Sequence, residues 1–229
     1  MAAVPTDQRS PPMPSLPELT IAGMHDAVIG EFSSRVAPPA RVVDLGAGTG
    51  AWATRLVAAG YEVVAVERAV DRFACKSAKV VSADLNQNFA DAVEGKFDVV
   101  TAIEVIEHLE NPRHILRQAK QLLKPGGLMF VTTPNIECVP ARIRFLVNGE
   151  LRMFGRDPVF NDPTHITPIH TQMFERMIAD VGFELVGHSF NRDQPTVQKG
   201  ILRVIARAVT PFLRGVTGGD CHIFVLRSA

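Results

Sequence analysis

The sequence predicts an α/β fold in which parallel strands form an open, doubly wound sheet with helices on both faces. Five short, apolar and β-branched runs follow one another between residues 41 and 135, and helical segments separate several of them. This alternation is typical of βαβ units, whose parallel strands are buried on both faces. A chain of 229 residues, 46% of them apolar, is long enough for one such core and short for two.

The first residues differ in composition from the rest. Residues 1–17 carry five prolines and few apolar side chains, so we expect a disordered arm, followed by a single domain over residues 18–229. Apolar positions at helical spacing from Leu19 to Val36 predict a helix that Pro38 ends. The sequence shows no signal peptide and no apolar run of about 18 residues, the length of a membrane span. We therefore expect a cytoplasmic protein.

The charge and the cysteines narrow the function further. Lys plus Arg and Asp plus Glu are balanced at 24 each. No global positive field then draws the protein to nucleic acid, which disfavours nucleic acid as the partner without excluding it. The three cysteines show neither a disulfide framework nor the spacing of a cysteine zinc site.

The first predicted strand and the turn after it form the stretch RVVDLGAGTG, residues 41–50. Gly46, Gly48 and Gly50 allow positive φ, and AWATRLVAAG continues as a helix. A strand, glycine turn and helix of this kind presents backbone N–H groups to a nucleotide-type ligand. Gly46, Gly48 and Ala51 also satisfy the dinucleotide fingerprint, so a nicotinamide cofactor is an alternative at this point.

Each of the next three predicted strands ends on an acid. YEVVAVER ends near Glu67, AKVVSADL near Asp84, and FDVVTAIEVIEHL contains a strand that ends near Glu104. Because the carboxyl ends of parallel strands share one edge of a sheet, we expect these acids around one ligand crevice. Carboxylate acceptors suit the ribose hydroxyls and the exocyclic amine of an adenosine ligand.

The second half of the chain adds an insertion to this pattern. NPRHILRQAKQLLKPGG predicts an amphipathic helix, and GLMFVTTPN predicts the fifth strand. Residues 136–169 then interrupt the alternation and are long enough for a functional insertion that covers the crevice. HTQMFERMIADVG predicts another helix, and FELVGHSF a strand.

A basic amphipathic segment at about residues 199–214 precedes the last strand, CHIFVLRS. Such a segment is suited to peripheral contact with a membrane surface or with a lipid-like substrate. Packing against the protein's own domain is the commoner use of this pattern, and we prefer it here.

Taken in order, these motifs resemble the class I S-adenosylmethionine-dependent methyltransferases over roughly residues 20–229. The likeness rests on VVDLGAGTG, VVAVER, VVSADL, FDVVTAIEVIEHL and LKPGGLMFVTTPN. It implies a Rossmann-like sheet that is mostly parallel and ends in an antiparallel C-terminal strand. It also implies S-adenosyl-L-methionine as the cofactor, whereas a dehydrogenase would leave the last two strands, Asp44 and Asp84 unexplained.

The same resemblance assigns roles to individual residues. Asp44 would lie near the amino group of the cofactor, Glu67 would hold the ribose hydroxyls, and Asp84 the adenine amine. The cofactor-binding residues that the resemblance implies are Asp44, Gly46, Gly48, Gly50, Glu67, Asp84, Leu85 and Glu104.

EVIEH, residues 104–108, places two carboxylates and an imidazole within one turn. With one later histidine, they form our candidate set for catalysis and for a divalent cation: Glu104, Glu107, His108 and His165. Oxygen-rich ligands with one or two imidazoles suit magnesium or manganese, with zinc also possible. An equally open alternative has Glu104 lining the pocket, Glu107 capping or pairing, and His108 acting as a general base or packing.

E-x-x-E-H with a distal histidine also resembles the metal-dependent small-RNA 2′-O-methyltransferases, and ubiquinone-pathway O-methyltransferases carry similar sequence. The distal stretch NDPTHITPIH departs from the His–Asp–His-rich element of the RNA enzymes. We therefore expect O-methylation of a small-molecule hydroxyl on a sugar, a phenol or a lipid-linked acceptor. The alternatives are an RNA 2′-O-methyltransferase and a non-catalytic cofactor-binding scaffold, and the sequence does not indicate an oligomeric state.

Overall fold

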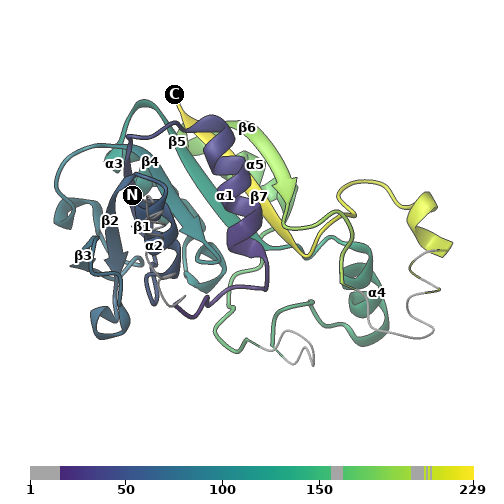
Figure 1. Ribbon diagram of the computed structural model, residues 1–229. Coiled ribbons are helices and arrows are strands. Elements are labelled where there is room, and N and C mark those ends of the chain that lie inside the picture. Colours follow the sequence, from purple (N-terminus) through teal and green to yellow (C-terminus); the bar gives the residue numbers. More distant parts are fainter. Residues whose placement is uncertain (1–15, 156–161, 197–203, 205, 207) are drawn as a thin grey trace, which may run out of the picture.

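The computed structural model describes residues 16–155, 162–196, 204, 206 and 208–229. One sheet with the strand order β3-β2-β1-β4-β5-β7-β6 runs through the molecule (Figure 1). Its seven strands are β1 Arg41–Leu45, β2 Glu62–Glu67, β3 Lys79–Ser82, β4 Phe97–Ile103, β5 Leu123–Pro134, β6 Phe183–Phe190 and β7 Cys221–Ser228. The order reverses between β1 and β4, as in other doubly wound sheets.

The first five strands are parallel, and β7 lies between β5 and β6, antiparallel to both. The predicted α/β class, with a mostly parallel Rossmann-like sheet and an antiparallel C-terminal strand, is therefore confirmed. β3 ends at Ser82, so Asp84 lies in the turn after the strand rather than at its last residue.

Helices cover both faces of the sheet. The longer helices are α1 Met24–Arg35, α2 Ala51–Ala58, α3 Pro112–Leu122, α4 Val139–Asn148 and α5 Thr171–Val181. Helices α1 and α2 pack into one apolar cluster on one face, and α3 and α5 pack into a second cluster on the other. Two layers of helices thus bury the near-continuous apolar runs of β1, β4 and β5.

Helix α3 illustrates how local sequence specifies these elements. The Asn111 side chain accepts hydrogen bonds from the N–H groups of Arg113 and His114, and Pro112 occupies the first turn. Ile115, Leu116, Ala119 and Leu122 recur at helical spacing and are all buried. A capped start and one apolar face therefore dock α3 on the sheet.

Helix α4 lies in the predicted insertion and stands apart from the sheet (Figure 1). Part of this insertion, 156–161, falls outside the described residues, as do residues 1–15 of the predicted arm and much of the segment at 199–214. Within the parts of the chain that the structure describes, no helix is long and apolar enough to cross a membrane.

Candidate active site

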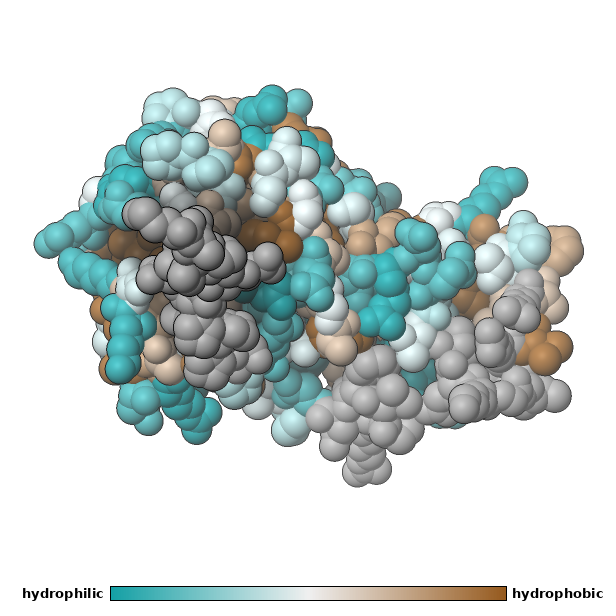
Figure 2. Space-filling view, in the orientation of Figure 1, coloured by the Kyte–Doolittle hydropathy of each residue, from teal (hydrophilic) through white to brown (hydrophobic). Residues whose placement is uncertain are grey.

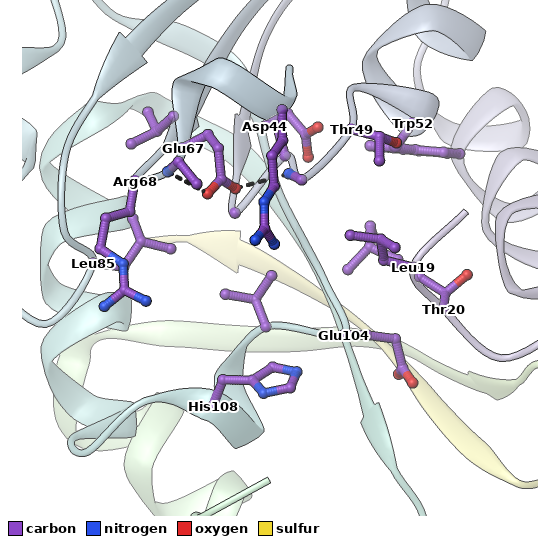
Figure 3. A pocket seen from close by; sticks show the side chains of 18 of the residues that line it. Leu19, Thr20, Asp44, Thr49, Trp52, Glu67, Arg68, Leu85, Glu104 and His108 are labelled. Atoms are coloured by element: carbon purple, nitrogen blue, oxygen red, sulfur yellow. Dashed lines mark hydrogen bonds between the residues drawn. The ribbon is translucent and has the colours of Figure 1, made fainter. Parts of the chain in front are cut away.

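A cavity of about 590 Å³ opens at the carboxyl ends of β1, β2 and β4 (Figure 3). Its volume falls within the range of about 300–1,000 Å³ that is usual for cofactor sites. The predicted residues that line it are Asp44, Gly46, Gly48, Glu67, Asp84, Leu85, Glu104 and His108. Gly50, Glu107 and His165 are not among its lining residues.

The glycine turn after β1 needs its glycines for two different reasons. Gly46 has φ 70°, and a Cβ there would lie 2.7 Å from Cγ2 of Val105, so the backbone must pass close to this side chain. Gly50 caps α2 with φ 84° and faces the side chains of Phe73 and Cys75 rather than the cavity. Gly50 therefore serves the turn, while Gly46 and Gly48 form the cavity wall.

Glu67, at the end of β2, ties this turn to the neighbouring strand. One of its carboxylate oxygens accepts a hydrogen bond from the N–H of Gly48 and the other from the N–H of Ala69, each at 2.8 Å (Figure 3). A carboxylate held in this way keeps further lone pairs for hydroxyl donors.

Asp44, near the end of β1, is almost wholly buried. Its carboxylate is linked to Thr101 and, through it, to Trp52, a connection that the sequence did not predict. The Thr101 hydroxyl donates to Oδ1 of Asp44 at 2.8 Å and accepts from the indole N–H of Trp52 at 3.2 Å. Oδ2 of Asp44 has no hydrogen-bond partner among the described residues. Burial raises the pKa of Asp44 to about 7. The sequence sign of this role is that Thr101 is the one hydroxyl residue in the otherwise apolar run VVTAI.

Asp84 and Leu85 lie in the turn after β3. Oδ1 of Asp84 accepts from the N–H of Asn86 at 2.9 Å, which holds the turn. Leu85 is buried and contributes an apolar surface to the cavity.

The segment before α1 crosses the cavity, which the sequence did not predict. Leu19 and Thr20 line the cavity, and the Thr49 hydroxyl donates to the carbonyl of Pro17 at 2.7 Å. Glu18 pairs with Arg55 at 2.6 Å and lies 3.3 Å from Nδ1 of His25. Polar contacts therefore fasten this strap, residues 17–20, to the glycine turn and to α2.

Replacing Glu18 by Ala is expected to speed dissociation of a bound cofactor by up to about fivefold, because a partly exposed ion pair of this kind contributes up to about 1 kcal/mol. Stopped-flow displacement of the cofactor measures this rate. Glu31→Ala, which removes an ion pair with Arg35 within α1, is the matched control and should leave the rate unchanged. Equal rates in all three proteins would show that the strap does not retain the cofactor.

Glu104 follows β4 with φ 54°, a left-handed conformation that is costly for a residue with a Cβ. Thr132 donates to Oε1 of Glu104 at 3.1 Å, and the thiol of Cys221 lies 3.6 Å from Oε2. Burial raises the pKa of Glu104 to about 7. The only other non-glycine residue with positive φ in the described parts of the chain is Met153, whose carbonyl is bonded to Nδ1 of His165.

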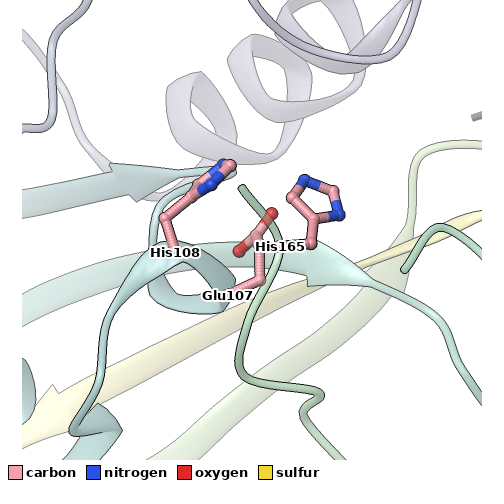
Figure 4. A group of neighbouring side chains, drawn as sticks. All are labelled: Glu107, His108 and His165. Atoms are coloured by element: carbon pink, nitrogen blue, oxygen red, sulfur yellow. The ribbon is translucent and has the colours of Figure 1, made fainter. Parts of the chain in front are cut away.

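Glu107, His108 and His165 form a second group beside the cavity (Figure 4). One potential ligand atom from each lies within 4.8 Å of the others. Glu104 was predicted with them but lies outside this group, because its carboxylate is turned to Thr132 and Cys221. The structure thus brings together three of the four predicted ligands.

The hydrogen bonds of the two histidines involve Nδ1 of each ring and leave Nε2 without one among the described residues, although Nε2 of His165 lies 3.6 Å from Oδ2 of Asp162. Nδ1 of His165 lies 2.6 Å from the carbonyl of Met153 and must donate to it. Nδ1 of His108 lies 2.9 Å from the Thr164 hydroxyl, which itself donates to Asp162 at 2.5 Å. These partners assign the proton to Nδ1 in both rings, so Nε2 carries the lone pair. Burial lowers the pKa of His165, which favours the neutral, metal-binding form.

Glu107 is fully buried, and neither of its carboxylate oxygens has a hydrogen-bond partner among the described residues. Burial and the nearby charge of Glu104 raise its pKa well above the ordinary value. Its backbone carbonyl accepts from the N–H groups of Ile166 and Thr167, each at 2.9 Å, and so joins the 136–169 insertion to EVIEH. A buried carboxylate without partners is costly unless a cation or donor completes it.

A cavity of this size at the switch point between β1 and β4, in a sheet that is parallel except for an antiparallel β7, is typical of the class I S-adenosylmethionine-dependent methyltransferases, whose cofactor is S-adenosylmethionine. The sequence pattern of methyltransferase domains matches residues 24–188. The chain belongs to this methyltransferase-domain family.

Individual methyltransferases are similar to this chain in sequence or in structure. A ubiquinone biosynthesis O-methyltransferase from Xanthomonas campestris is 31% identical over 130 residues, which cover 52% of this chain and 54% of the relative. The chain thus matches about half the length of this curated relative. A SAM-dependent methyltransferase from Archaeoglobus fulgidus has the same fold, with a TM-score of 0.65 at 19% identity over 88% of this chain and 92% of that one. Magnesium protoporphyrin IX methyltransferase from Synechocystis, with bound SAH, has a TM-score of 0.57 at 14% identity. The match covers 90% of this chain and 82% of that one.

Proposed function

We propose that this chain transfers the methyl group of S-adenosylmethionine to a hydroxyl oxygen of a small-molecule acceptor, with a divalent cation held by Glu107, His108 and His165. The observation that carries the proposal is Glu107, a buried carboxylate with no hydrogen-bond partner among the described residues, which lies beside two histidine rings at the edge of the cavity. One carboxylate and two imidazoles suit zinc or manganese, and they suit magnesium if water completes the set.

The cavity suits the cofactor through its polar atoms. Oδ2 of Asp44, which has no hydrogen-bond partner within the described residues, would accept from the amino group of the methionine part of the cofactor. Glu67 would accept from the ribose hydroxyls, and the turn of Asp84 and Leu85 would hold the adenine. Bound S-adenosylmethionine supplies a methyl group that is already electrophilic, so the chain's main task is to align the acceptor with it.

A hydroxyl acceptor must lose a proton as it reacts, and Glu104 lines the cavity where that proton would leave. A general base works best when its pKa lies near the operating pH, and burial raises that of Glu104 to about 7. Thr132 holds the carboxylate in place as a positioning residue. A divalent cation at the neighbouring group would stabilise the oxyanion of the acceptor as a Lewis acid.

The relatives support oxygen as the acceptor atom, since the Xanthomonas campestris protein is described as an O-methyltransferase of ubiquinone biosynthesis. A phenol is therefore the acceptor to test first, and a sugar hydroxyl the next.

Removing divalent cations from the purified protein is expected to lower turnover of a catechol acceptor at least about a hundredfold. Restoring manganese, magnesium or zinc one at a time should recover it. Release of S-adenosylhomocysteine measures turnover, and calorimetry with S-adenosylmethionine measures cofactor binding separately. Undiminished turnover in the presence of a chelator would refute the proposal that a divalent cation takes part in the reaction. If the protein binds the cofactor but turns over no oxygen acceptor even when metal is present, the result would favour a non-catalytic cofactor-binding scaffold.

A further inference from the structure

The 136–169 insertion supplies His165 to the cation group, although its helix α4 projects away from the sheet (Figure 1). Figure 2 shows hydrophilic residues beside hydrophobic ones on the surface of this projecting part. A polar connection between the insertion and the sheet lies inside the protein. Arg152 of the insertion and Asp220, directly before β7, are both buried, and Nη2 of Arg152 lies 2.6 Å from Oδ1 of Asp220. This ion pair joins segments that are 68 residues apart in the chain.

Asp220 is held from several sides. Its two carboxylate oxygens accept from the N–H and the hydroxyl of Thr196, at 2.7 and 2.6 Å, and Nε of Arg192 lies 3.3 Å from Oδ2. The side-chain oxygen of Asn191 accepts from the N–H of Asp220 at 3.1 Å. Arg152 also donates to the carbonyl of Thr196 at 3.2 Å. A buried ion pair with such additional hydrogen bonds fixes the segments that carry it, and removal of one partner leaves an uncompensated charge.

The residue after Arg152 connects this ion pair to the cation group. Met153 is buried and has φ 66°, a left-handed conformation that persists only where the surrounding structure holds it. Its carbonyl accepts from Nδ1 of His165 at 2.6 Å, and the ring centroids of Phe154 and His165 are 5.3 Å apart. The bond to Met153 places the ring proton on Nδ1 and leaves the lone pair of Nε2 for a cation.

Histidines that bind metals usually donate their other ring N–H to a carbonyl or a carboxylate, and this partner sets the tautomer and the orientation of the ring. We propose that Asp220 is a positioning residue for the cation ligand His165. It acts through Arg152, which holds the segment whose Met153 carbonyl bonds to the ring. The inference rests on the proposed cation site, because Asp220 itself neither lines the cavity nor belongs to the cation group.

The tautomer of His165 in the metal-free protein tests this inference without any cation. Nitrogen NMR of protein with isotope-labelled histidines distinguishes a ring protonated at Nδ1 from one protonated at Nε2, and His165→Asn identifies the signal by its loss. Burial lowers the pKa of His165, so the ring is neutral at about pH 8. The unaltered protein should show the Nδ1–H form. Asp220→Asn should show a mixture of both forms, because the Met153 carbonyl is no longer held in place.

Calorimetric titration with manganese alone measures the consequence for the cation site. Asp220→Asn should weaken manganese binding about tenfold or more, while the Kd for S-adenosylmethionine stays unchanged. Arg152→Lys keeps the cation but loses the planar guanidinium, so it should show both effects to a smaller degree and tests the same path if Asp220→Asn does not fold. Val225→Ala, at a fully buried residue of β7, is the matched control. It should lower the Tm and leave the tautomer and the manganese affinity unchanged.

An Nε2–H ring in the unaltered protein would overturn the inference. So would an unchanged tautomer and unchanged manganese affinity in both Asp220→Asn and Arg152→Lys. If Val225→Ala changed both measurements as much as Asp220→Asn does, general loosening of the fold would be the cause, and the inference would also fail. Failure of the unaltered protein to bind manganese would refute the cation site, whereas a changed tautomer in Asp220→Asn would still support the positioning of His165 by Asp220.

Discussion

Replacing Glu107 by Met is expected to lower kcat about a hundredfold or more while making the metal-free protein more stable. The variant loses the only carboxylate of the proposed cation site, and with it the stabilisation of the acceptor's oxyanion. It also removes a fully buried carboxyl group that has no hydrogen-bond partner in the described parts of the chain, and burying such a group costs about 1–2 kcal/mol in the native state. For a chain of this size, the gain corresponds to a rise in Tm of about 2–8 °C.

Glu110→Met is the matched control, because Glu110 is exposed a few residues further along. It should change neither kcat nor Tm appreciably. The decisive comparison is the melting of metal-free Glu107→Met against the unaltered protein, with and without added manganese. Manganese should raise the Tm of the unaltered protein only. A lower Tm together with retained turnover would show that Glu107 is a structural residue.

Replacing Asp44 by Asn is expected to weaken S-adenosylmethionine binding about ten- to a hundredfold. A hydrogen bond to a charged group contributes about 1.5–3 kcal/mol, and Asn keeps the acceptor oxygen but loses the charge. Calorimetric titration measures the Kd directly. Asp71→Asn, at an exposed acid after β2, should leave the Kd unchanged. Unaltered affinity in Asp44→Asn would remove this residue from the cofactor site.

The same residue should also make cofactor binding depend on pH. Burial raises the pKa of Asp44 to about 7, so in the free protein its carboxylate form becomes dominant only above that pH. Binding to an amino group requires the carboxylate, and the Kd should therefore fall up to about tenfold between pH 6 and pH 8. Asp44→Asn should lose most of this slope, and what remains would report Glu104, whose pKa is also raised to about 7.

The stability of the cofactor-free protein should fall as the pH rises, whereas its affinity for the cofactor should increase. A carboxyl with a raised pKa in the folded state favours folding below its unfolded pKa, near 4. That contribution is lost as the pH rises through about 7. The Tm of the cofactor-free protein should therefore decline between about pH 4 and pH 7, and the decline should be smaller in Asp44→Asn.

Much of the cavity could be predicted because its residues follow strands whose pattern is local. The run VVDL predicts β1, and a glycine turn must follow it if backbone N–H groups are to meet a ligand. Glu67 ends β2 in the same way. Since parallel strands end at one edge, the position of an acid in sequence predicts its neighbourhood in space.

Other parts of the site depend on contacts between distant segments. Thr101 is one polar residue in an apolar strand, and its role appears only when Asp44 and Trp52 lie on either side of its hydroxyl. The strap at residues 17–20 crosses the cavity through bonds to Thr49 and Arg55, which no local pattern encodes.

The sequence by itself determined the α/β class, the order of the strands along the chain, the glycine turn and the acids that line the cavity. These follow from the period of apolar residues and from turn chemistry, both of which act over a few residues. Only the tertiary structure decided which of Glu104, Glu107, His108 and His165 form one group. Glu104 takes a left-handed backbone that turns its carboxylate to Thr132 on β5, while Glu107 and His108 meet His165 from the distant insertion. Side-chain direction depends on backbone dihedrals and on segments brought together by folding, and neither can be read from spacing.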